Sequence, residues 1–216
     1  MKHKIEIILT VIALLLGMLA TGCSQTSTTT TATEFNNVNS ASIKSGNGLS
    51  LSVSQDAKTY QSGYAITIII TEYNTLSKPN KRPIADKWPI KGLSDGICGT
   101  DNFPFGIAIF QGNYTADNIS TATPLILDNP NIIVPDCMPS VFNFTAYDFK
   151  PSSDIAFLNA PYGSTTFEMS REVTAGVYWE GNHPDAVQQF FAPGVYTVVA
   201  GDEWGNLVVL HFTVTN

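Results

Sequence analysis

The alternation of apolar and polar residues after position 48 limits the folds open to this chain more than any other feature. Leu49, Leu51 and Val53 alternate with serines, and residues 64–71 carry isoleucine on both faces of the same two-residue period. This period is that of a β-strand, and a second apolar face marks a strand near the middle of a sheet. No stretch shows a convincing helical period. The pattern therefore predicts an all-β fold.

Composition favours the same fold class. Only 13% of the residues are charged, whereas Thr, Ser, Asn, Ile and aromatic residues are plentiful. Helices prefer Ala, Leu, Glu and Lys, so this mixture favours strands and loops. An apolar fraction of 44% is ample for a hydrophobic core, which excludes a largely disordered chain.

The last thirty residues predict a β-hairpin. Residues 191–198 lead into a strand, residues 201–206 supply a turn, and residues 207–214 return antiparallel. The core face of the returning strand is expected to comprise Val208, Leu210, Phe212 and Val214.

Two segments resemble immunoglobulin-like modules. The sequence from Leu49 to Glu72-Tyr73-Asn74 is similar to the opening of many bacterial modules of this kind. Residues 191–198 look like the corner at which a tyrosine hydroxyl, here that of Tyr196, ties back to the preceding loop. The resemblance implies an immunoglobulin-like antiparallel β-sandwich over residues 48–216. Loop insertions at residues 76–104 and 113–139 would account for the length beyond about 100 residues.

The first 23 residues have the order of a secretory signal. Lys2 and Lys4 precede an apolar run at residues 7–19, and small residues lead to Cys23. The run is shorter than the roughly 20 residues of a spanning helix. The segment resembles a bacterial lipoprotein lipobox, which implies cleavage of a signal peptide at residues 1–22 and a lipidated Cys23. The chain would then be anchored to the cell membrane on its exported face. An uncleaved membrane anchor is the alternative.

Residues 23–47 predict a tether. They are rich in Ser, Thr, Asn and Gly and have few apolar residues, so they cannot bury enough surface to offset the entropy of ordering. We expect a flexible spacer between the lipid and the folded domain at residues 48–216.

The charge balance limits the partners. Loss of the leader would change the count from 11 basic and 18 acidic residues to 9 and 17. An acidic surface excludes a nucleic-acid partner, and it excludes docking to a membrane through a basic face. The expected partners are the membrane, through the N-terminal lipid, and a protein or a glycan.

Three cysteines indicate one disulfide. With Cys23 lipidated, Cys98 and Cys137 remain as an even pair in an exported protein. A bridge between them would join the two loop insertions. A metal site or a reactive thiol is the alternative, and no CxxC motif or nearby histidine favours it.

Several patterns are weak candidates for chemistry. Ser94 lies in a G-x-S-x-G match, but neither the strand nor the helix that a hydrolase elbow requires is expected beside it. His183 and His211, with Cys137 and Met138, do not have the ligand spacing of a blue-copper site, and we expect both histidines at the surface. Clusters of side-chain oxygens such as Asp128-Asn129 and Asp202-Glu203 are better explained as turns than as calcium ligands. We predict no catalytic residue, metal ligand or cofactor.

Loop aromatics are the best candidates for binding. Trp88, Trp179 and Trp204 lie in or beside loops, where such side chains stack on sugars, anchor a protein partner or cap the core. The sequence therefore predicts a lipid-anchored envelope protein whose β-sandwich is a non-catalytic binding or structural module. A carbohydrate-binding module is the first alternative, and an envelope hydrolase is the second.

Overall fold

The structure, a computed structural model, describes residues 39–93, 103–131, 145–160 and 163–216. These residues form fourteen strands and a single 3-10 turn, η1 (Ile119–Thr121), so the predicted all-β class is confirmed. The predicted signal peptide, the lipidated Cys23 and the Cys98–Cys137 pair lie outside the described residues.

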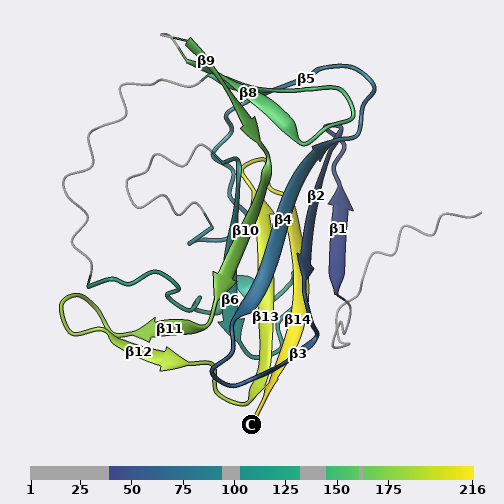
Figure 1. Ribbon diagram of the computed structural model, residues 1–216. Coiled ribbons are helices and arrows are strands. Elements are labelled where there is room, and N and C mark those ends of the chain that lie inside the picture. Colours follow the sequence, from purple (N-terminus) through teal and green to yellow (C-terminus); the bar gives the residue numbers. More distant parts are fainter. Residues whose placement is uncertain (1–38, 94–102, 132–144, 161–162) are drawn as a thin grey trace, which may run out of the picture. The chain divides into compact units, whose positions relative to one another are not determined.

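Strands β1 to β14 form four sheets, shown in Figure 1. The first sheet has the order β1-β2-β4-β10, from Ser40–Lys44, Leu49–Gln55, Ile66–Asn74 and Ser170–Ala175. The second has the order β3-β14-β13-β6, from Thr59–Gln61, Leu207–Thr215, Gly194–Asp202 and Phe105–Gln111. The third has the order β5-β7-β8-β9, from Asn80–Pro83, Ala146–Phe149, Ile155–Ala160 and Gly163–Glu168. A two-stranded ribbon pairs β11 (Val177–Glu180) with β12 (Val187–Phe190).

Pairing is antiparallel throughout the described sheets except where β3 runs parallel to the end of β14. The predicted C-terminal hairpin is confirmed, with Tyr196 opposite Phe212 and Val198 opposite Leu210. Strand β13 also pairs with β6, so it lies inside its sheet.

The main core lies between the first two sheets. Alternate residues of β2 and β4, among them Leu51 and Ile68, pack in one apolar cluster with Tyr196, Leu210 and Phe212 of the second sheet. Figure 1 shows the β13–β14 hairpin behind β4 and β2. The stacked rings of Tyr196 and Phe212 lie 5.1 Å apart at the centre of this cluster. Burial of alternating positions therefore holds the two sheets face to face.

A second cluster covers the other face of the β6–β13 pair. Ile90, Leu93 and Ile119, which belong to the predicted loop insertions, pack on Phe110 and Val199. Residues 196–202 of β13 are consequently buried on both faces. Because the insertions form this cover, they act as a third layer beside the second sheet.

The folded region begins earlier than residue 48. Strand β1 lies within the segment that the sequence analysis assigned to the tether, and Ser40 to Lys44 pair in register with Ser54 to Ser50. The segment has few large apolar residues because β1 is an edge strand, and its stability comes from the backbone ladder to β2.

A cross-strand pair of glycines admits the 88–93 segment to the second sheet. Gly106 of β6 lies opposite Gly201 of β13. A Cβ atom built at Gly106 would lie 1.6 Å from the backbone oxygen of Leu93, and one at Gly201 would lie 2.4 Å from the Leu93 side chain. Only glycine leaves room for this approach.

Gly106→Ala is therefore expected to destabilise the fold by about 1–3 kcal/mol, the usual cost of overpacking a close-packed site. Gly46→Ala is the matched control, because a Cβ atom there has no neighbour within 4 Å. Chemical denaturation measures both variants. Equal stability of the two would contradict the close approach of Leu93.

Candidate ligand-binding pocket

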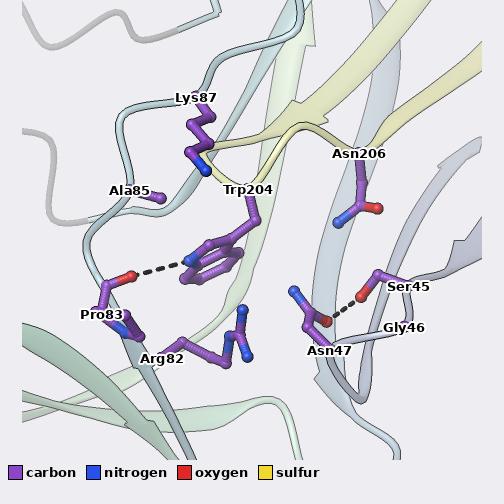
Figure 2. Close-up of a pocket in the computed structure, with 9 residues that line it drawn as sticks. All are labelled: Ser45, Gly46, Asn47, Arg82, Pro83, Ala85, Lys87, Trp204 and Asn206. Atoms are coloured by element: carbon purple, nitrogen blue, oxygen red, sulfur yellow. Dashed lines mark hydrogen bonds between the residues drawn. The ribbon is translucent and has the colours of Figure 1, made fainter.

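Three segments that are distant in sequence form a pocket of about 380 Å³. They are the β1–β2 turn, the end of β5 with the segment after it, and the β13–β14 turn. The lining residues are Ser45, Gly46, Asn47, Arg82, Pro83, Ala85, Lys87, Trp204 and Asn206. Figure 2 shows Arg82 and Trp204 on one side of the pocket and Asn47 with Ser45 on the other.

The β13–β14 turn is fixed by the carboxylate of Asp202. Its Oδ1 accepts hydrogen bonds from the backbone N–H groups of Trp204 at 3.0 Å and Asn206 at 2.8 Å. Its Oδ2 accepts a bond from the Asn206 side-chain amide. The interpretation of Asp202 as a turn residue is confirmed, since these bonds close the hairpin locally.

The segment after β5 is tied to this turn by three hydrogen bonds. The Ala85 N–H donates to Glu203 Oε1 at 3.2 Å, and the Lys87 N–H donates to the Glu203 backbone oxygen at 2.7 Å. The Trp204 indole N–H donates to the Pro83 oxygen at 2.9 Å. The pocket wall therefore has a defined position relative to the strands.

The β1–β2 turn supplies the opposite wall. Asn47 Oδ1 accepts hydrogen bonds from the Leu49 N–H at 2.9 Å and from the Ser45 hydroxyl. The Asn80 side-chain amide donates to the Asn47 backbone oxygen at 3.0 Å, which joins the turn to β5. Residues expected to be tether are thus part of the pocket.

The cations of the pocket are Arg82 and Lys87. The Arg82 guanidinium lies 5.8 Å from the centre of the Trp204 ring, in a cation–π contact. Within the described residues its buried Nε has no hydrogen-bond partner. Among the residues that the structure describes, no acidic side chain lines the pocket. The cavity accordingly carries a local positive charge on an acidic chain.

The three tryptophans lie in different surroundings. Trp204 lines the pocket and packs edge-on against Tyr147 at 5.9 Å and Phe149 at 6.2 Å. Trp88 packs against the second apolar cluster, and Trp179 of β11 pairs through its backbone with Ile126. Of the three tryptophans, only Trp204 lines the pocket.

His211 is buried, contrary to the expectation of a surface histidine. It is 3% exposed, and its Nε2 lies 2.8 Å from the backbone oxygen of Tyr114. The alternation along β14 places it on the outer face, as expected, but the segment around Tyr114 covers that face. His183 is exposed in the β11–β12 turn.

A buried carboxyl group, Glu72, faces the core from β4. It is fully buried, and within the described residues neither of its carboxyl oxygens has a hydrogen-bond partner. Burial, and secondly the charge of Asp202, raise its pKa well above 4.5. Burial also raises the pKa of Asp202, and it raises that of Glu203 to about 7. The pKa of each of these three carboxyl groups is therefore higher in the folded protein than in an unfolded chain.

Sequence reasoning missed most of the pocket. Arg82, Lys87, Asn47 and Asn206 have no spacing that marks a site, because three separate turns bring them together. The one available signal was the aromatic residue at the tip of the C-terminal hairpin. Ser94, Cys98, Cys137 and Met138 lie outside the described residues.

Among the described residues, no three His, Cys, Asp or Glu side chains are grouped as metal ligands. None of the described helical structure has the length and apolar character needed to cross a bilayer. Comparison with known proteins found no matching family model, curated protein or solved structure.

The free energy of unfolding is expected to fall as pH rises from about 4.5 to about 7, the range between the unfolded and folded pKa values of Glu203. Folding raises the pKa values of Glu72, Asp202 and Glu203. The stabilising contribution of each group is therefore fully present at a pH below its unfolded pKa, and it is lost as pH rises through its folded pKa. Glu72 and Asp202 contribute in the same direction as Glu203, because the pKa of each is also raised in the folded protein.

Glu72→Gln should reduce this pH dependence, because the amide keeps the shape and cannot ionise. Urea denaturation at several pH values measures it. His211 acts in the opposite direction below about pH 6.5, since burial lowers its pKa, but it does so equally in both proteins. An unchanged slope in the variant would show that Glu72 ionises normally.

Proposed function

We propose that this protein is a lipid-anchored, non-catalytic binding module on the extracytoplasmic face of the cell membrane. The leader and Cys23 support the location, and the pocket beside Trp204 supports the binding role. The pocket carries the proposal, because hydrogen-bonded turns fix its walls before any ligand arrives. A preformed site loses little conformational entropy on binding.

We propose an immunoglobulin-like sandwich as the scaffold. Two strand orders support this proposal: β2-β4-β10 would correspond to strands A, B and E of that fold, and β14-β13-β6 to strands G, F and C. The Tyr196 hydroxyl donates to the Ala192 oxygen at 2.8 Å, as in a tyrosine corner. The third sheet is then an insertion whose strands lie between B and E in sequence.

Lipidation is tested by mass spectrometry of the membrane fraction. The expected N-terminus is an acylated Cys23, and Cys23→Ser should release the protein from the membrane because the lipid is its attachment. A chain that retains residues 1–22 would refute the processing step.

Binding at the pocket is tested with a glycan and peptide panel, using the full-length chain in mild detergent. Gly46 lines the pocket, is exposed, and has open space around its Cβ position. Gly46→Trp should therefore fill the cavity without disturbing the strands and weaken binding by at least about tenfold, or about 1.4 kcal/mol.

Gly46→Ala is the control and should bind as the wild type does. Thermal unfolding of both variants establishes that they are folded. Absence of any ligand in the panel, or equal affinity in Gly46→Trp, would remove the pocket as the binding site.

A further inference from the structure

We infer that the pocket binds an acidic saccharide, a hydroxylated ring that carries a carboxylate or a phosphate. This inference rests on the proposed binding function and adds the class of the ligand. It follows from the charges, the remaining hydrogen-bonding groups and the apolar wall of the pocket.

The two cations favour an anion. Arg82 and Lys87 both line the cavity, and within the described residues the buried Nε of Arg82 has no hydrogen-bond partner. A guanidinium at the wall of a partly enclosed cavity is a site for a carboxylate or phosphate, which it binds with two parallel hydrogen bonds. Trp204 holds this guanidinium through the cation–π contact.

The acidic residues nearby do not cancel this charge. Asp202 is fully buried, and its oxygens accept hydrogen bonds within its own turn. Glu203 is 5% exposed, accepts a bond from Ala85, and has a pKa of about 7. Asp86 is exposed and lies outside the lining. The groups that face the cavity are therefore neutral or cationic.

Neutral groups of the pocket suit hydroxyls. Among the described residues, the side-chain amide nitrogen of Asn47 and the side-chain amide oxygen of Asn206 make no hydrogen bond. The other atom of each amide group does: Asn47 Oδ1 accepts a bond and Asn206 Nδ2 donates one. One donor and one acceptor then remain for hydroxyl groups. Pro83, Ala85 and the Trp204 ring supply an apolar wall for the C–H face of a sugar. A volume of about 380 Å³ is large enough for a small ligand.

Isothermal titration calorimetry tests the ligand class with two matched pairs of probes. Trigalacturonate is compared with its methyl ester, and glucose 6-phosphate with glucose, so that each pair presents the same sugar with and without the anionic group. Inorganic phosphate tests whether the anion suffices without the ring. We expect the charged member of at least one pair to bind about tenfold or more tightly, with an affinity that falls as salt rises.

Charge variants test the residues. Arg82→Gln should weaken binding of the acidic probe by about tenfold or more, the usual effect of a lost charge-assisted bond. Lys81→Gln is the matched control, because Lys81 is exposed on the same strand and does not line the pocket. Gly46→Glu should weaken binding much more than Gly46→Gln, since the two side chains differ only in charge.

The outcomes separate the two proposals. The proposal of an acidic ligand would be wrong if neutral probes bound as tightly as acidic ones and if Arg82→Gln and Gly46→Glu left the affinity unchanged. The proposed binding function would then still stand. If inorganic phosphate alone bound with the same affinity as the acidic saccharides, the proposal that the ligand is a saccharide would be wrong. If Gly46→Trp changes the binding of no probe or panel member, both proposals fail. Thermal unfolding verifies that each variant is folded.

Discussion

Burial of β13 on both faces is the constraint on which the rest of the structure depends. One face of this strand joins the core between the two large sheets, and the other is covered by residues of the loop insertions. A strand enclosed in this way has little freedom to change register, because a one-residue slip would exchange the residues of two different clusters. The turn that follows it therefore has a defined place.

That defined place allows the pocket to exist. The turn of residues 202–206 holds the segment after β5 through Glu203 and Trp204, and Asn80 of β5 in turn holds the β1–β2 turn. Hydrogen bonds thus join the walls of the cavity to one another and to the turn that follows the buried strand β13. The same arrangement encloses three carboxyl groups, whose raised pKa values are the electrostatic cost of a closely packed end.

Strand pairing of the C-terminal hairpin could be predicted from the sequence, because the two-residue period of residues 207–214 depends only on neighbours along the chain. The burial of His211 could not, since the cover over its face comes from residues around Tyr114, far away in sequence. Strand β1 was missed for a related reason: an edge strand needs few apolar residues when a neighbour supplies its backbone partners. Trp204 was identified from its place in a turn, whereas Arg82 and Lys87 have no local signature.

Gly46 gives the pocket wall a property that its other parts lack. Most wall residues take part in hydrogen bonds that hold the turns together, so their replacement disturbs the scaffold. Gly46 has free space around it and an unstrained backbone. A larger or charged side chain at this single position can therefore alter the shape and charge of the cavity with little effect on the strands around it.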